Sequence, residues 1–241
     1  MAVRYAVDGS VAAITLDRPT RLNAYDVAMR DALWAALGAA ADDPLVRVVL
    51  LRGAGSAFCV GGDLGEFGTA PSPLAARAVR FARDVPGRLA RFPKPIVAAV
   101  HGYAVGGGLE MALAADVCIA AADARFRLPE VGLGMVPGVG GTQTLPRAVG
   151  VGRAADLVLT RRWVDASEAL AMGIVTRVVA SAALVAEATA LAALIATRAP
   201  RLVAAARRAI GDGLDLPLAL GLALETRLAL TARGARASEA S

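Results

Sequence analysis

The first part of the chain alternates short apolar runs with amphipathic stretches. Residues 3–16 alternate apolar and polar positions around Asp8-Gly9-Ser10, which predicts two strands joined by a turn. Residues 26–41 repeat apolar positions at helical spacing between Asp26, a good helix cap, and Pro44, which cannot continue a helix. The pattern therefore predicts an opening β-hairpin followed by an amphipathic helix.

Three further runs are apolar at most positions, as expected of buried strands: 46–53, 96–100 and 117–120. Helical stretches at roughly 74–91 and 108–115 lie between them, which gives a repeated order of strand, strand and helix. Glycine-rich loops follow these units, first at Gly61-Gly62 and then from Gly102 to Gly108. Loops on a rigid frame carry function more often than the frame does, so the sites are expected there.

Beyond about Val179 the pattern is almost wholly helical, with segments at 183–197, 200–211 and 217–233. We place a boundary at this point, between a core of residues 1–180 and a C-terminal helical region of residues 181–241. Short helices rich in Ala and Leu cannot bury all their apolar surface against each other. We expect them to pack on the core or on a neighbouring subunit.

Composition narrows the function classes. With 241 residues, 56% of them apolar and 20% charged, the chain is a folded globular protein. No segment is long and apolar enough to span a membrane and no signal segment opens the chain, so a cytoplasmic location without membrane association is expected. Two cysteines and a single histidine argue against a disulfide framework and a zinc site. The net charge of +5 comes from scattered arginines, and aromatic residues are only 4%, which argues against nucleic acid as a partner.

The chemistry-bearing feature is a triple glycine, Gly106-Gly107-Gly108, that precedes Glu110. Glycine lets backbone N–H groups approach a ligand, and a helix that starts there points its N–H groups at developing negative charge. Glu130 lies on another element, before the glycine-rich run 137–142. An oxyanion hole beside two carboxylates suits proton transfer and water activation at a polarised carbonyl.

Five segments, in this order, resemble the enoyl-CoA hydratase/isomerase family of the crotonase superfamily along nearly the whole chain. They are residues 17–24, 58–64, 101–110, 124–133 and 137–143. The resemblance implies an α/β fold of the ββα-spiral type, in which stacked small sheets are flanked by helices and a C-terminal helical region mediates trimerisation. It also implies an enzyme that binds a CoA thioester.

The same resemblance assigns the catalytic roles. Glu110 and Glu130 match the two catalytic glutamates of enoyl-CoA hydratases, Glu110 for the water that attacks Cβ and Glu130 for the proton at Cα. The backbone N–H groups of Gly62 and Gly107 match the oxyanion hole. The expected reaction is reversible hydration of the 2,3 double bond of a 2-enoyl-CoA thioester.

Residues expected to contact the substrate and its CoA portion follow from the same motifs. They are Arg21, Leu22, Gly62, Asp63, Leu64, Gly65, Gly106 and Gly107. Position 65 is often lysine in relatives, so affinity for the CoA phosphates is expected to depend on Arg18, Arg21 or another segment. No cofactor is expected, because CoA is part of the substrate.

Two departures from the family concern the substrate pocket. The segment 66–90, which in relatives covers the acyl chain, is shorter than in many of them. Residues 238–241 lie near where relatives continue into a last helix with an aromatic and a basic residue that reach CoA. The resemblance assigns those two roles to no residue here, and the size of the acyl pocket stays open.

Several conspicuous residues are expected to be structural. His101 is not expected to be catalytic, because both proton-transfer roles are filled. Asn23 is expected to fix a turn, and Asp116 to bind local backbone groups. Cys59 and Cys118 are expected to be small buried residues. The triple glycine lacks the spacing of a dinucleotide-binding loop.

The sequence is also compatible with other functions. A Δ3,Δ2-enoyl-CoA isomerase, or another crotonase-type acyl-CoA enzyme, would use the same site with one base that moves a proton. A scaffold or RNA-associated homologue without turnover is a third hypothesis. Because relatives form trimers and dimers of trimers, a homotrimer or dimer of trimers is expected.

Overall fold

The computed structural model describes residues 1–234, without the side chains of a few residues in two helices (Pro73, Ala76, Arg77, Arg80, Phe81, Arg233 and Gly234). Its centre is a six-stranded sheet in the order β1-β2-β3-β4-β6-β9. These strands are β1 (Val3–Asp8), β2 (Val11–Leu16), β3 (Val48–Gly53), β4 (Ile96–Val100), β6 (Val117–Ala121) and β9 (Arg177–Val179). The β1–β2 pair is antiparallel and every other pair is parallel.

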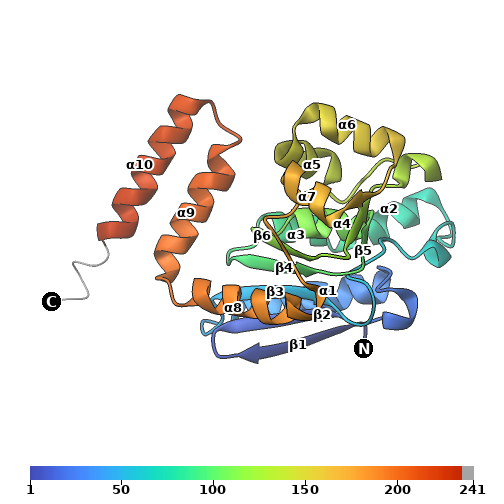
Figure 1. The fold of residues 1–241 in the computed structure, drawn as a ribbon, viewed down its shortest axis with the longest axis horizontal. Coiled ribbons are helices and arrows are strands. Elements are labelled where there is room, and N and C mark those ends of the chain that lie inside the picture. The colour runs from blue at the N-terminus through green and yellow to red at the C-terminus, as the bar shows by residue number, and fades with distance from the viewer. Residues whose placement is uncertain (235–241) are drawn as a thin grey trace.

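Helices cover both faces of this sheet (Figure 1). One face packs against α1 (Val27–Asp42), α3 (Val85–Ala90) and α4 (Gly107–Leu113), and the other against α8 (Leu184–Ala196). Alternation along β3 explains the division, because Val49 and Leu51 face the first layer while Val48 and Leu50 face α8. A strand buried on both faces must be apolar throughout, as the sequence pattern predicted.

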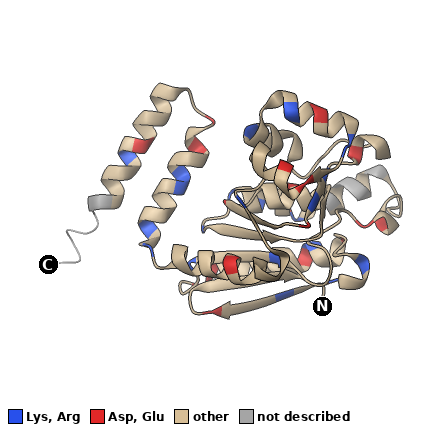
Figure 2. Cartoon of the chain, in the orientation of Figure 1, with Lys and Arg blue, Asp and Glu red and all other residues tan. Residues whose placement is uncertain are grey.

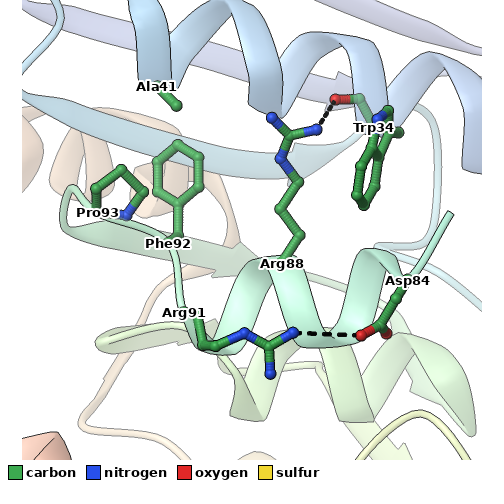
Figure 3. Close-up of a pocket in the computed structure, with 7 residues that line it drawn as sticks. All are labelled: Trp34, Ala41, Asp84, Arg88, Arg91, Phe92 and Pro93. Atoms are coloured by element: carbon green, nitrogen blue, oxygen red, sulfur yellow. Dashed lines mark hydrogen bonds and ion pairs between the residues drawn. The ribbon is translucent and has the colours of Figure 1, made fainter.

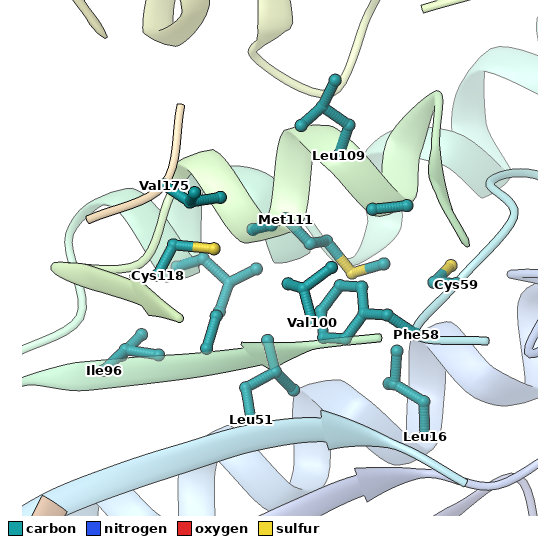
Figure 4. Close-up of a cluster of buried hydrophobic side chains, with 14 of the residues drawn as sticks. Leu16, Leu51, Phe58, Cys59, Ile96, Val100, Leu109, Met111, Cys118 and Val175 are labelled. Atoms are coloured by element: carbon teal, nitrogen blue, oxygen red, sulfur yellow. The ribbon is translucent and has the colours of Figure 1, made fainter. Parts of the chain in front are cut away.

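The larger core lies beneath α4. Figure 4 shows Leu109 and Met111 of α4 above a layer that includes Phe58, Val100 and Leu51. Phe58 and Val100 are fully buried, and Leu51 is 1% exposed. Dense packing of this kind leaves little freedom to the backbone of α4, which carries Glu110.

A second, three-stranded sheet joins β5 (Tyr103–Val105), β7 (Arg125–Arg127) and β8 (Val164–Asp165). Three helices accompany it: α5 (Gly141–Val149), α6 (Val151–Thr160) and α7 (Ala166–Met172). The expectation of a continuous loop from Gly102 to Gly108 was wrong, because its middle forms β5. The strand is only three residues long, so its pattern could not be distinguished from a loop.

The segment predicted as one helical stretch at 74–91 is two helices, α2 (Pro73–Ala82) and α3. The break has a local cause: the Asp84 side chain accepts a hydrogen bond from Gly87 N–H and caps a new helix. Pro86 follows, and a proline is tolerated in the first turn of a helix but not in its interior. The other predicted elements, including the opening hairpin and α1 capped by Asp26, are confirmed.

The C-terminal helices divide into two parts. The buried side of α8 packs directly on the main sheet, whereas α9 (Pro200–Gly213) and α10 (Leu218–Gly234) form a hairpin that projects from it (Figure 1). Arg207 of α9 is bonded to Asp116 and to the Phe92 carbonyl of the core. The division at residue 180 stays a prediction, and residues 238–241 lie outside the described part.

Charged residues of both signs are spread over most elements, as Figure 2 shows. Among the described residues, no single helix is long and apolar enough to cross a membrane. Only two helices taken together would have the length and apolar composition of a membrane span, and a bend of 107° separates them: Ser181–Ala196 and Pro200–Gly213.

Candidate active site

Glu110 lies in the first turn of α4 and is 1% exposed. Its Oε1 accepts hydrogen bonds from the backbone N–H groups of Val139, at 2.9 Å, and Gly141, at 2.7 Å. Gly141 is the first residue of α5, where backbone N–H groups lack partners inside the helix. The start of one helix thus fixes the carboxylate carried by another.

Gly141 must be glycine for this contact. A Cβ at that position would lie 2.8 Å from Glu110 Oε1 and 2.9 Å from its Cγ. The preceding Gly140 has a φ of +111°, which favours glycine as well. The sequence pattern singled out the run 137–142 but gave it no role. Its signal was a glycine pair at the head of a helical stretch.

Glu130 also lies against the triple glycine. It begins the short 3-10 helix Glu130–Leu133, just after β7. A Cβ on Gly106 would lie 2.6 Å from Glu130 Oε1, so this carboxylate lies directly against the glycine loop. Within residues 1–234, Oε2 of Glu130 is buried and has no hydrogen-bond partner. Burial, and secondarily the charge of Glu110, raises the pKa of Glu130 above its usual value.

Both carboxylates lie next to the Gly106-Gly107 peptide. A Cβ on Gly107 would be 4.0 Å from Glu110 Oε2, while Gly106 faces Glu130. Gly106 has a φ of +52°, and its N–H donates to the Arg127 carbonyl at 2.9 Å. The folded chain therefore brings together both predicted glutamates and the triple glycine.

The second glycine loop lies beside the first. A Cβ on Gly61, whose φ is +87°, would lie 2.7 Å from the Val105 carbonyl oxygen and 3.3 Å from Gly107 N. Only a residue without a side chain lets these two backbones come so close. Gly62 and Gly107, predicted as the two oxyanion donors, are thereby on adjacent segments.

Neither of these two N–H groups donates a backbone hydrogen bond to another described residue. Gly107 is the first residue of α4, where no helical acceptor exists. Gly62 is exposed, and its neighbours take the hydrogen bonds instead: Tyr25 N donates to the Gly61 carbonyl, and Asp63 N donates to the Tyr25 carbonyl. Two N–H groups on adjacent segments thus have no backbone acceptor among the described residues.

Apolar side chains surround the Gly62 loop. The Phe67 ring would lie 3.0 Å from a Cβ on Gly62, and Phe67 is 51% exposed. Leu64 and Leu22, both predicted substrate contacts, are also partly exposed, at 62% and 37%. Sequence reasoning missed Phe67, because a lone aromatic residue in a polar loop carries no periodic signal.

The predicted CoA contacts differ in their surroundings. Arg21 and Gly65 are exposed, and Arg21 lines a surface hollow together with Pro19, Thr20 and Asp26. The Asp63 carboxylate accepts hydrogen bonds from Gly65 N–H and from Arg18, which hold its pKa below the usual value. Arg18 lines the same hollow and forms ion pairs with Asp26 and Asp63 of the protein, and its contact with the CoA phosphates stays a prediction.

Asn23 is fully buried and forms a hub. Its Oδ1 accepts from Arg18 N–H, and its Nδ2 lies within hydrogen-bond distance of the Ala54, Ala57 and Phe58 carbonyls. The prediction that Asn23 fixes a turn is confirmed.

The other residues expected to be structural also have protein partners. Asp116 accepts a hydrogen bond from Ile96 N–H at 2.7 Å, so it binds backbone as expected, but of a strand 20 positions away and not of its own turn. The thiols of Cys59 and Cys118 are buried, and burial raises the pKa of each to about 12. The His101 ring is hydrogen-bonded to the Gly55 carbonyl at 2.9 Å.

A different hollow lies between α1 and α3 (Figure 3). Its lining consists of Trp34, Ala41, Asp84, Arg88, Arg91, Phe92 and Pro93. The Arg88 guanidinium donates to the Trp34 carbonyl at 3.1 Å and lies 4.2 Å from the centre of the indole ring. Neither glutamate and neither glycine loop lines this hollow, so the candidate site lies elsewhere. Within the described residues, no group of three His, Cys, Asp or Glu residues could hold a metal ion.

The family model and similar curated proteins indicate the same family. Residues 6–237 match the model of the enoyl-CoA hydratase/isomerase family. The chain is 40% identical over 221 residues to the "probable enoyl-CoA hydratase echA8" of Mycobacterium bovis, covering 92% of this chain and 85% of that protein. It is 38% identical over 220 residues to the short-chain-enoyl-CoA hydratase of Clostridium acetobutylicum, covering 91% and 84%.

Solved structures agree. The crystal structure of an enoyl-CoA hydratase from Bacillus anthracis superposes with a TM-score of 0.90 at 36% identity, over 95% of this chain and 89% of that one. The likeness confirms the predicted α/β fold of the crotonase type, with small sheets flanked by helices and a C-terminal helical region. The chain is an enzyme that belongs to the enoyl-CoA hydratase/isomerase family.

Proposed function

We propose that this enzyme hydrates the 2,3 double bond of 2-enoyl-CoA thioesters. The observation that carries the proposal is the position of Glu110 and Glu130 next to the Gly106-Gly107 peptide, which itself lies against the Gly61-Gly62 loop. A relative that is 38% identical to this chain over 220 residues is a short-chain-enoyl-CoA hydratase, which supports the same reaction.

The chemistry follows from these groups. The Gly62 and Gly107 N–H groups would bind the thioester oxygen, and a pair of such donors stabilises the negative charge that develops there. Glu110 would accept a proton from water while the water oxygen forms a bond to Cβ. The π electrons move onto the thioester oxygen as an enolate, and Glu130 then gives a proton to Cα. The balance is one water added across the double bond.

The surroundings of Glu130 suit a proton donor. Burial and the nearby Glu110 raise its pKa, and a carboxyl whose pKa lies nearer to neutrality holds its proton in a larger fraction of molecules. Glu110, fixed by two backbone N–H groups, suits the orientation of water. Two positioned carboxylates avoid the movement that one residue serving both ends would need.

CoA binding and assembly belong to the same proposal. The exposed Arg21, on the hollow beside Pro19 and Thr20, would meet the CoA phosphates. The α9–α10 hairpin would join neighbouring copies in a homotrimer or a dimer of trimers, since Ile210, Leu214 and Leu218 are at least 68% exposed.

A cytoplasmic location is also proposed, and fractionation of the source cells with detection of the native protein tests it.

Turnover of crotonyl-CoA tests the reaction. Hydration removes the absorbance of the conjugated thioester and adds 18 mass units, from one water, whereas isomerisation leaves the mass unchanged. Glu110→Gln separates the two activities, because an isomerase that relies on Glu130 would keep substantial activity and a hydratase would lose most of it. Glu187→Gln, on the exposed side of α8, is the control. Absence of turnover with short, medium and branched enoyl-CoAs would contradict the proposal, and binding of RNA without CoA would favour a scaffold.

A further inference from the structure

One guanidinium joins two carboxylates next to the Gly62 loop. Arg18 Nη1 lies 3.0 Å from Asp26 Oδ2 and donates to the Ala24 carbonyl at 2.6 Å, and Nη2 lies 3.0 Å from Asp63 Oδ2. The Arg18 side chain is only 21% exposed, and those of its two acidic partners are 16% and 14% exposed. Ion pairs this protected from water are screened less than surface pairs.

Each partner of Arg18 belongs to a segment that frames the site. Asp63 directly follows Gly62, and Asp26 caps α1 by accepting a hydrogen bond from Met29 N–H at 2.7 Å. Asn23 Oδ1 accepts from the Arg18 backbone N–H at 2.8 Å. The cation therefore connects the Gly62 loop to the start of α1.

The backbone pairing explains why this connection affects the oxyanion site. Tyr25 N donates to the Gly61 carbonyl at 2.7 Å, and Asp63 N donates to the Tyr25 carbonyl at 2.9 Å. Successive peptide groups of an extended segment point to opposite sides, so this parallel bridge turns the Gly62 N–H away from Tyr25. The direction of that N–H depends on how firmly Asp63 is held against residues 24–26.

We propose that Arg18 is a positioning residue that aims the Gly62 N–H of the oxyanion hole through its ion pair with Asp63. The inference rests on the proposed function, since it concerns a residue that positions one oxyanion donor of the same site. Without Arg18, Asp26 and Asp63 lose the charge that holds both of them. Asp63 moves from its place, and an uncompensated carboxylate lies beside an oxygen that becomes negative during the reaction.

A competing role for Arg18 is direct contact with the CoA phosphates. That role predicts a change in KM for crotonyl-CoA and none for crotonyl-pantetheine, which lacks the nucleotide. The positioning role predicts a fall in kcat with both substrates, because the thioester carbonyl is common to them.

The experiment compares Arg18→Met, Arg18→Lys, Asp63→Asn and the double variant Arg18→Met with Asp63→Asn. Arg18→Met is expected to lower kcat by about 10- to 100-fold with both thioesters, as for the partial loss of one oxyanion donor. The double variant is expected to recover part of this loss, because it also removes the negative charge of Asp63 that Arg18→Met leaves without its cation. Arg4→Met, which breaks the exposed Arg4–Asp17 ion pair of 2.8 Å, is the matched control and keeps the wild-type kcat.

The absorption spectrum of a bound chromophoric thioester gives a second measurement. It reports the polarisation of the thioester carbonyl and not the overall stability of the fold. A donor-substituted cinnamoyl-CoA absorbs at longer wavelength when its carbonyl is polarised, so the red shift on binding measures the oxyanion hole. The shift is expected to shrink in Arg18→Met and to return in part in Arg18→Lys. If Arg18→Met does not fold, the kcat and the red shift of Asp63→Asn and Arg18→Lys are compared with those of the wild type instead.

Two different results would overturn the proposed function and the positioning role of Arg18. Wild-type protein without turnover of any enoyl-CoA overturns the proposed function. Wild-type turnover together with an unchanged kcat and red shift in Arg18→Met, or an effect confined to the KM of the CoA substrate, overturns the role of Arg18.

Discussion

The backbone N–H of Gly141 donates a hydrogen bond of 2.7 Å to Oε1 of Glu110. The two residues are 31 positions apart in the chain, and the bond joins the start of α5 to the first turn of α4. The Glu110 carboxylate accepts hydrogen bonds from backbone N–H groups that would otherwise lack partners at the start of α5, and these donors in turn hold the carboxylate in place. This exchange is the basis of the first prediction.

Gly141→Ala is expected to displace Glu110, because the new Cβ would lie 2.8 Å from Oε1. Misplacement of a catalytic group by about 1 Å lowers the rate by about 10²-fold. Steady-state hydration of crotonyl-CoA measures the effect. Gly152→Ala near the start of α6, where a Cβ would meet nothing within 4 Å, is the control and should raise stability by up to about 1 kcal/mol. Equal kcat values in the two variants would contradict the role of the Gly141 contact.

Gly107 offers a test of the oxyanion hole itself. Proline fits the first position of a helix but removes the N–H, so Gly107→Pro is expected to lower kcat by about 10²- to 10³-fold without unfolding α4. Gly107→Ala keeps the N–H, and its Cβ would approach Val139 no closer than 3.7 Å. Circular dichroism checks the fold of both variants. A proline variant as active as the alanine variant would show that this N–H does not contribute.

The raised pKa of Glu130 gives a pH dependence with a defined sign. A carboxyl whose pKa is higher in the folded than in the unfolded state stabilises the fold below the unfolded pKa, and this contribution is lost as pH rises through the folded pKa. Glu130→Gln, which cannot ionise, should therefore gain stability relative to wild type as pH rises above the ordinary glutamate pKa of about 4.3. Urea unfolding across this range measures the difference, and a difference independent of pH would refute the shift.

Removal of the Glu110 charge should partly reverse that shift. In Glu110→Gln, the pKa of Glu130 is expected to fall, because the negative charge that disfavours its ionisation is gone. NMR titration of carboxyl groups labelled with ¹³C follows the change. Burial is the larger cause and is unaltered in this variant, so the pKa should stay above its usual value. An unchanged titration midpoint would show that the two carboxylates do not interact.

Asn23 should contribute strongly to stability. Asn23→Ala leaves several buried backbone groups without partners and places alanine at a φ of +57°. Each unsatisfied buried group costs about 1–3 kcal/mol, so a loss of about 3 kcal/mol or more is expected in denaturant unfolding. Thr189→Ala on the exposed side of α8 should change the free energy of unfolding by less than about 0.5 kcal/mol. A similar effect of both substitutions would contradict the role of Asn23.

The projecting hairpin predicts the assembly. Ile210→Asp with Leu218→Asp places charges on side chains that are 68% and 79% exposed in the single chain. If this surface is covered by neighbouring copies, burial of unpaired charge disrupts it and the molar mass from light scattering falls to that of a monomer. Leu45→Asp, at an equally exposed site outside the hairpin, should leave the mass unchanged. A wild-type protein that is already monomeric would contradict the proposed trimer.

The sequence by itself determined most elements of the fold. Residues 96–100 had to be a buried strand because every side chain is apolar, and Asp26 marked the start of α1 because its side chain can cap a helix. The short strands β5, β7 and β8 carried too few residues for a period to be visible, and their pairing depends on partners far along the chain.

The same distinction applies to the site. The sequence determined which residue types were available, since Glu110 follows a triple glycine and a second glycine-rich run lies at residues 137–142, whereas the helix α5 that starts at Gly141 was not predicted. Only the tertiary structure decided that Gly141 anchors Glu110 and that Glu130 faces Gly106. It also paired Arg18 with Asp26 and Asp63, whereas the sequence offered Arg18 only as one contact for the CoA phosphates. Local periodicity reports which face of an element is buried, whereas contacts between distant segments follow from packing of the whole chain.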